Sequence, residues 1–347
     1  MNSVITFLSE NWQRLELQRF GGAPDLSSLI VTPRFKASSH LIFFILTKTE
    51  TEPILVVKVP RIPGDNRRLQ REAENLRWIQ STRSDGFDSI PKVIAFEDYA
   101  KNRFLVETAV TYETMRPGVV RRRPEICINA ILDWLIDLQN STRTKRDFSE
   151  VKHRRELVLR PLQYFEQTFP CSSVEKDLVA DTKQIVMSLL EETWPFVCEH
   201  GDLSSPNILM GQEDKIGVVD WELAEPRGVP ATDLFFFLTY IAFARKNARK
   251  NEDYLAAFHK AYFEESPWTA PYIKRYREKI SISEKILKPL FVLCWSRYVA
   301  SLVGRLKTYE DEEGKLSKQT ADWVRSNRYY ALWNYAVENN GALALAS

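Results

Sequence analysis

The sequence has little of several features that mark particular classes of protein. Its 347 residues include four cysteines, Cys127, Cys171, Cys198 and Cys294, with no C-x-x-C spacing. A chain of this length does not need disulfide staples, so we expect reduced thiols in a cytoplasmic protein. The segment MNSVITFLSENWQRLE lacks a basic leader and reaches Glu10 before an apolar core forms. We therefore do not expect secretion.

Neither sign of charge dominates, and long apolar runs are missing. Lys and Arg number 48 against 46 Asp and Glu, a net charge of +2, which gives no general field for nucleic acid or an anionic membrane. The densest basic run, residues 121–123, is more typical of a solvated helix entrance. The most apolar stretch, residues 234–244, falls well short of the roughly 20 residues that span a bilayer. It predicts a buried helix, and we expect neither nucleic acid nor membrane as a partner.

The patterns that are present predict an α+β chain with two lobes, because single cores stop growing at roughly 250–300 residues. Apolar, β-branched runs at residues 41–48 and 53–60 predict a hairpin, and residues 66–80 have helical periodicity. Two more strands are predicted at residues 92–98 and 103–110, after which helical patterns prevail. We place the lobes at residues 1–107 and 108–347.

One polar segment interrupts the helical pattern of the second half: VCEHGDLSSPNILMGQEDKIGVVDWELA, residues 197–224. Asp202 lies in a loop, Asn207 follows it five positions later, and Asp220 ends the second of two short strands. Phosphoryl transfer needs a carboxylate that orients the acceptor and oxygen ligands for Mg²⁺. Asp202 suits the first task, and Asn207 with Asp220 suits the second. A single Asp or Asn would be read as a turn former, but three at this spacing predict a site.

The strings HGDLSSPN and VVDWE resemble the aminoglycoside phosphotransferase and choline kinase family of small-molecule kinases. The matching residues occur in the family's order: His200, Gly201, Asp202, Pro206, Asn207, Asp220, Trp221 and Glu222. The resemblance implies a protein-kinase-like α+β fold, with a small antiparallel-sheet lobe carrying one main helix and a larger, mainly helical lobe. It implies ATP or GTP as donor with Mg²⁺, Asp202 as catalytic residue, and Asn207 and Asp220 as metal ligands. His200 would support the loop, and Asp233 would anchor it.

The resemblance also extends upstream, over roughly residues 29–240. It implies that Lys58 holds the donor phosphates and is paired with a glutamate of the following helix, for which Glu72 is preferred to Glu74. The hinge at residues 107–110, represented by Glu107 and Ala109, would offer backbone groups to the purine. The phosphate-covering loop, residues 32–41, contains no glycine, and Ser38 and Ser39 are its candidate phosphate donors.

Other residues have two readings. Glu222 would face a cationic substrate or lie in a solvated loop. Seven aromatic residues could cage a quaternary ammonium, although helix packing is the more typical role: Trp295, Tyr298, Trp323, Tyr329, Tyr330, Trp333 and Tyr335. Gln139 occupies a position where relatives often carry histidine, and we expect a structural role. His40, His153 and His259 have no motif around them and are expected at packing or surface positions.

The sequence thus predicts a kinase that phosphorylates a hydroxyl of a small molecule: an amino sugar, sugar, amino alcohol or nucleoside. The alternative is a catalytically silent kinase-like module that binds a ligand or a protein, which the glycine-free phosphate loop motivates. A protein-directed kinase is disfavoured, because HGD replaces HRD and WEL replaces the phenylalanine and glycine that follow the metal aspartate.

Overall fold

The computed structural model describes residues 3–21, 25–32, 40–48, 50–143, 150–310 and 314–345. Its strands are β1 Leu26–Val31, β2 His40–Thr47, β3 Leu55–Pro60, β4 Val93–Tyr99, β5 Asn102–Thr108, β6 Glu113–Thr114, β7 Val197–Glu199, β8 Ile208–Met210, β9 Ile216–Val218 and β10 Glu225–Gly228. Its α-helices are α1 Ser3–Asn11, α2 Arg67–Ser81, α3 Pro117–Arg122, α4 Pro124–Ser141, α5 Glu150–Thr168, α6 Ser173–Val186, α7 Ser188–Glu191, α8 Thr232–Lys246, α9 Asn251–Tyr262, α10 Ala270–Ile280, α11 Leu287–Lys307, α12 Lys318–Ser326 and α13 Arg328–Glu338. Four short 3₁₀ turns complete the described elements: Leu17–Phe20, Gln212–Asp214, Glu284–Ile286 and Asn340–Ala342.

The chain forms two compact units. The first contains Met1–Thr114 and Pro206–Ala224, and the second contains Met115–Ser205 and Glu225–Ser347. We expected one boundary after residue 107; the chain leaves the first unit after Thr114 and returns to it for Pro206–Ala224. The return segment belongs there because β8 pairs with both β6 and β9. Its backbone also reaches the loop before β4, where the Val218 N–H donates to the Ser89 carbonyl at 2.8 Å.

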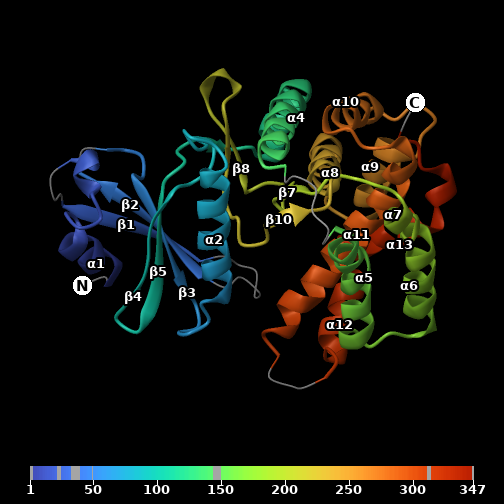
Figure 1. Cartoon of the computed structure of the whole chain (residues 1–347), viewed down its shortest axis with the longest axis horizontal. Coiled ribbons are helices and arrows are strands. Elements are labelled where there is room, and N and C mark those ends of the chain that lie inside the picture. The colour runs from blue at the N-terminus through green and yellow to red at the C-terminus, as the bar shows by residue number, and fades with distance from the viewer. Residues whose placement is uncertain are drawn as a thin grey trace. The chain divides into compact units, whose positions relative to one another are not determined.

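The first unit is built on an antiparallel five-stranded sheet in the order β1-β2-β3-β5-β4 (Figure 1). The predicted strands and the predicted helix are all present as β2, β3, β4, β5 and α2. In the central register, Ile42 of β2 lies opposite Lys58 of β3, which lies opposite Leu105 of β5. Strand β1 was not predicted, because its LSSLIV sequence lacks a clear alternation and its pairing with β2 gives it the strand geometry.

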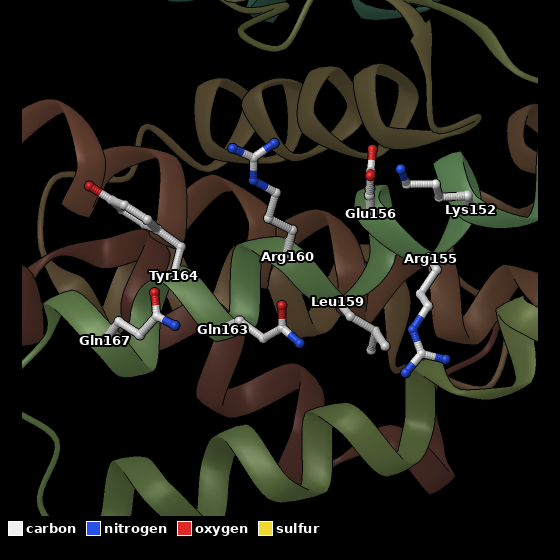
Figure 2. A pocket seen from close by; sticks show the side chains of 8 residues that line it. All are labelled: Lys152, Arg155, Glu156, Leu159, Arg160, Gln163, Tyr164 and Gln167. Atoms are coloured by element: carbon white, nitrogen blue, oxygen red, sulfur yellow. The ribbon is translucent and has the colours of Figure 1, made fainter. Parts of the chain in front are cut away.

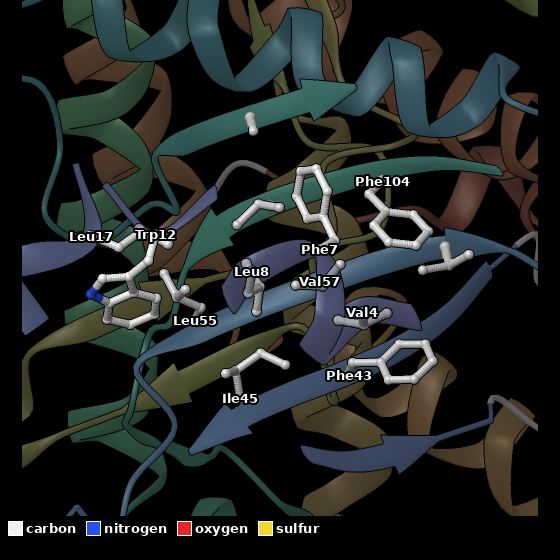
Figure 3. Close-up of a cluster of buried hydrophobic side chains, with 13 residues drawn as sticks. Val4, Phe7, Leu8, Trp12, Leu17, Phe43, Ile45, Leu55, Val57 and Phe104 are labelled. Carbon is white, nitrogen blue, oxygen red and sulfur yellow. The ribbon is translucent and has the colours of Figure 1, made fainter. Parts of the chain in front are cut away.

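Helices cover the sheet on both faces, and the period-2 alternation of strands decides which residues meet which helix. Figure 3 shows Phe7 and Leu8 of α1 packed over Phe43, Ile45 and other odd-numbered residues of β2 and β3. On β5, Phe104 joins this cluster, whereas Leu105 packs with Leu69 and Ala73 of α2. The even-numbered residues of β2 and β3 therefore face α2.

The second unit is mainly helical, with one short β-ribbon formed by β7 and β10. The predicted apolar helix is α8, and it is buried along most of its length. One described stretch, Glu284–Lys307, is long and apolar enough to cross a membrane by length and composition alone. However, 78% of its most apolar window is buried, and it packs against α5, α6, α8 and α13. It is the central packing helix of this unit.

Candidate active site

A buried ion pair joins the central strand of the sheet to α2. Lys58 points to the α2 face, and its Nζ lies 2.5 Å from Oε1 of Glu72. Both side chains are almost fully buried, whereas Glu74 is exposed. The helical period explains the choice, because Glu72 shares a face with the buried Leu69 and Leu76. The structure therefore places Glu72, and not Glu74, against the lysine.

The same glutamate oxygen also holds the segment that follows Asp220. The backbone N–H of Trp221 donates to Glu72 Oε1 at 3.0 Å. One turn further along α2, the side-chain amide of Asn75 donates to the carbonyls of Trp221 and Ala224, at 3.0 and 3.1 Å. One helix thus fixes both the lysine and the end of the β9 segment.

A second carboxylate, which the sequence did not assign to this pair, lies on the other side of Lys58. Glu107 Oε1 is 3.2 Å from Lys58 Nζ, and the side chain is buried. Burial raises the pKa of Glu107 to about 7, in spite of the nearby lysine. Burial by itself lowers the pKa of Lys58, but Glu107, Glu72 and Asp220 together raise it, so the lysine stays charged. The sequence contained a signal for this position of Glu107. Strand alternation puts Glu107 on the same face as Leu105, which is the face that α2 covers.

The hinge backbone takes part in the sheet. Glu107 pairs with Val56 of β3 and Val93 of β4. The Ala109 N–H lies 3.4 Å from the Ile54 carbonyl. The purine contact of these backbone groups stays a prediction. Ser38 and Ser39, the candidate phosphate donors, lie outside the described residues.

Asp220, a predicted metal ligand, has an unusual backbone conformation and an unsatisfied side-chain oxygen. Its φ of +69° is in the left-handed region, which non-glycine residues rarely adopt. Its Oδ1 is buried and has no hydrogen-bond partner among the described residues. Asn207 is close along the strands, because its carbonyl accepts from the Val219 N–H at 3.0 Å. Buried oxygens normally have a partner, so an unsatisfied carboxylate oxygen here fits the oxygen-seeking Mg²⁺.

Two further residues lie beside Asp220, and one of them was not expected to have a chemical role. His40 opens β2, and its Nδ1 is 3.6 Å from Oε2 of Glu222. Ligand atoms of His40, Asp220 and Glu222 all lie within 4.8 Å of one another. Glu222 Oε1 is also 3.6 Å from the guanidinium of Arg68. Burial, followed by the charge of Lys58, lowers the pKa of His40. Glu222 thus faces cationic and imidazole groups of its own unit, and its contact with substrate stays a prediction.

The catalytic-loop residues of the second unit are held by a buried aspartate. Asp233, in the first turn of α8, accepts the His200 N–H on Oδ2 at 2.8 Å and the Gly201 N–H on Oδ1 at 2.9 Å. The Asp202 N–H lies 3.2 Å from His200 Nδ1. Gly201 has a φ of +83°, which suits glycine and turns the chain sharply before Asp202. Burial, followed by the charge of Glu199, raises the pKa of Asp233 to about 7.

A buried ion pair that the sequence did not reveal supports the same loop. Arg297 of α11 donates to both carboxylate oxygens of Glu199, each at 2.8 Å. Glu199 Oε2 also accepts the Val229 N–H at 3.0 Å. Gln139 supports the strand from α4, since its amide donates to the Cys198 carbonyl at 3.2 Å. It accepts from the Tyr276 hydroxyl at 2.5 Å, which agrees with the structural role expected for it.

Part of the predicted aromatic set forms a cluster on α8, α11 and α13. Tyr298 and Tyr329 have ring centroids 4.4 Å apart, and each also contacts Phe236, at 4.8 and 5.4 Å. Burial and the negative charge of Asp202 both raise the pKa values of the two tyrosines. This aromatic cluster is therefore in the electrostatic field of the predicted catalytic residue. Trp333, in contrast, is fully buried and packs edge-on against Phe165 of the helical core.

Two arginines also lie at this aromatic cluster. The guanidinium of Arg305 lies 5.6 Å from the Tyr298 ring centroid, and that of Arg328 lies 4.8 Å from the Tyr329 ring centroid. Figure 2 shows a separate groove along α5, lined by basic and amide side chains such as Arg155, Arg160 and Gln163. That groove contains none of the residues predicted to carry the chemistry.

The small antiparallel sheet with its lysine–glutamate pair, and the helical unit with its aspartate-anchored loop, define a kinase-like two-lobe fold. The model of the phosphotransferase enzyme family matches residues 36–272. The chain belongs to this family. Solved structures of a choline kinase and of an aminoglycoside phosphotransferase share its fold. The chain is accordingly a kinase that acts on a hydroxyl group.

Solved structures share the fold at low sequence identity. Choline kinase LicA from Streptococcus pneumoniae is 12% identical, with 96% of this chain and 98% of that chain covered and a TM-score of 0.55. The GDP complex of aminoglycoside 2′-phosphotransferase-IIIa is 14% identical, with 98% and 100% covered and a TM-score of 0.55. Amicoumacin kinase hAmiN in complex with AMP-PNP, Ca²⁺ and Ami is 10% identical, with 90% and 87% covered and a TM-score of 0.50. No curated protein matches the sequence.

Proposed function

We propose that this protein transfers the γ-phosphoryl group of ATP or GTP, with Mg²⁺, to a hydroxyl of a small molecule. One observation carries the proposal. Oxygen Oε1 of Glu72 accepts hydrogen bonds from Lys58, the lysine predicted to bind the donor phosphates, and from the backbone N–H of Trp221, next to Asp220. The lysine and the cation ligand are thereby held to one another by a single buried carboxylate. A mere turn-forming aspartate would not need this support.

The donor is assigned to the first unit. Lys58 stays protonated and would neutralise donor phosphate oxygens, while Glu72 keeps its amine in place. Asn207 and Asp220 would hold Mg²⁺, which when bound offsets the negative charge of the phosphates. Relatives of the same fold were solved with GDP and with AMP-PNP, which supports a purine nucleotide as donor.

The acceptor is assigned to the second unit. The Asp202 carboxylate would orient the acceptor hydroxyl and take its proton as the hydroxyl oxygen bonds to the γ-phosphorus. The bond from that phosphorus to the bridging β,γ-oxygen breaks, and its electrons leave with ADP or GDP. Asp233 contributes by fixing the backbone on which Asp202 lies.

The charges around the aromatic cluster bear on whether it could cage an ammonium group. The faces of Tyr298 and Tyr329 that could attract an ammonium have Arg305 and Arg328 beside them. An added positive charge would be repelled by these guanidinium groups. These arginines argue against an ammonium cage at the aromatic cluster, and the screen described below distinguishes the four predicted acceptor classes.

The alternative of a silent binding module remains motivated by the glycine-free phosphate loop. It differs from the kinase in one measurable respect, since a silent module would bind nucleotide without phosphate transfer to any acceptor. We also propose a cytoplasmic setting, because the four cysteines are free thiols and three of them are buried.

The first experiment measures thermal stability with Mg²⁺–ATP and Mg²⁺–GTP, together with nucleotide consumption over sugars, nucleosides, amino sugars and amino alcohols. Asp220→Asn is the test variant, since Asn tolerates a positive φ and retains the size of the side chain. Asp177→Asn, an exposed change on α6, is the control. The kinase predicts a nucleotide-dependent shift that Asp220→Asn loses and Asp177→Asn keeps, with turnover on one acceptor class. A shift without turnover on any acceptor would favour the silent module.

A further inference from the structure

His40 is the first residue of β2 and lies where this strand enters the sheet. Strand alternation places His40 on the same sheet face as Lys58, because odd-numbered residues of β2 and β3 pack under α1. Its side chain is only 4% exposed and is directed toward the segment after β9. A histidine there meets two acidic residues, Asp220 and Glu222, from a part of the chain about 180 residues away.

The spacing of these three groups suits one metal ion. Metal–ligand distances of roughly 2.0–2.2 Å allow ligand atoms on opposite sides of an ion to be roughly 4–4.4 Å apart. The ligand atoms of His40, Asp220 and Glu222 all lie within 4.8 Å of one another, so a small contraction would bring them into one coordination shell. Within this set, His40 Nδ1 and Glu222 Oε2 are 3.6 Å apart, which suits two neighbouring ligands of one ion.

A second observation points to a cation independently of this spacing. Asp220 Oδ1 is buried without a hydrogen-bond partner among the described residues. The positive φ of Asp220 shows that the backbone is held in a costly conformation at this side chain. A cation would satisfy the oxygen, and the imidazole would complete a mixed nitrogen and oxygen ligand set.

We propose that His40 joins Asp220 and Glu222 in a nitrogen-containing cation site, so that this site binds Mn²⁺-type divalent ions more tightly than its oxygen ligands alone would. The proposal rests on the proposed function, because it refines the ion that Asp220 would hold. Mg²⁺ prefers an all-oxygen, octahedral shell, whereas imidazole is a good ligand for first-row transition metals. A ligand set with one imidazole and two carboxylates therefore shifts affinity toward the transition metal.

The test measures the metal directly on the full chain, without nucleotide. Pulsed electron paramagnetic resonance of bound Mn²⁺ reports nitrogen coordination through ¹⁴N modulation of the echo. We expect ¹⁴N modulation in the wild type and its loss in His40→Gln. We also expect Mn²⁺ affinity to fall by about tenfold or more in His40→Gln, while Mg²⁺ affinity, measured by competition, changes much less. His259→Ala, an exposed histidine of α9, is the matched control and should keep both signals.

The outcomes separate this inference from the proposed function. If Mn²⁺ binds the wild type but shows no ¹⁴N modulation, His40 is not a metal ligand. If Asp220→Asn also abolishes the nucleotide-dependent thermal shift in that case, the proposed kinase function still stands. The ¹⁴N measurement is made on the wild-type protein, so it does not require that a His40 variant folds. Absence of both metal binding and a nucleotide shift would overturn both proposals.

Discussion

Lys58 and Glu72 form an ion pair, with 2.5 Å between Nζ and Oε1, in which both side chains are withdrawn from water. Removing Glu72 takes away the closer of the two carboxylates beside the buried Lys58 charge and leaves Glu107 at 3.2 Å. Glu72→Gln should lower the free energy of unfolding by about 3–5 kcal/mol, measured by urea denaturation. Glu74 lies on the exposed face of the same helix, so the unfolding free energy of Glu74→Gln should stay within about 0.5 kcal/mol of the wild-type value. Equal stability of the two variants would show that the pair does not hold the fold.

Asp202 should matter for turnover and not for nucleotide binding. Asp202→Asn keeps the size of the side chain but is a poor proton acceptor, so the rate of phosphate transfer should fall at least about 10²-fold, or about 2.7 kcal/mol of barrier. Single-turnover kinetics on the acceptor found by the screen measures this loss. The nucleotide-dependent thermal shift should persist. Full turnover in Asp202→Asn would remove Asp202 from its assigned role.

Glu107 should make the protein less stable as pH rises toward neutrality. Burial raises its pKa from the ordinary 4.5 to about 7, so between these values the folded state binds more protons than the unfolded state. The stabilisation from its bound proton is complete below pH 4.5 and is lost as pH rises through 7. Glu107→Gln should therefore flatten the decrease in unfolding free energy over pH 4.5–7. An unchanged slope in denaturation curves across this range would assign the pH dependence to other groups.

Glu175 should act in the opposite direction. Burial raises its pKa, but hydrogen bonds from Arg325 Nε and the Ser172 N–H, both at 2.7 Å, outweigh burial and lower the pKa to about 2. Its stabilisation is present above pH 4.5 and is lost as pH falls to about 2. Glu175→Gln should cost of the order of 3 kcal/mol at pH 7 and much less at pH 2.

The control for Glu175 is a pair at the surface. Glu166 and Lys183 are 2.7 Å apart but both are about 40% exposed, with side-chain values of 38% and 36%. Solvent weakens such a pair, so Glu166→Gln should cost about 0–1 kcal/mol at pH 7. A loss in Glu166→Gln as large as that in Glu175→Gln would show that burial is not what separates the two glutamates.

Local sequence patterns were sufficient for much of the fold and for predicting the residues of the candidate site. Apolar alternation located β2 and β3, and the helical period located α2 and put Glu72 on its buried face. The order of Asp202, Asn207 and Asp220 was readable because those residues lie within one short segment. Each of these features depends on neighbours along the chain.

Other parts of the site were decided by contacts between distant segments. Glu107 lies beside Lys58 only because β5 pairs with β3 in a particular register, and Arg297 meets Glu199 from a helix 98 residues later. His40 reaches Asp220 and Glu222 through the pairing of β2 and the return of residues 206–224 to the first unit. The sequence by itself was enough to predict which residues would carry phosphoryl transfer. Only the tertiary structure decided which charges surround them, because strand register and helix packing bring together side chains that no local pattern connects.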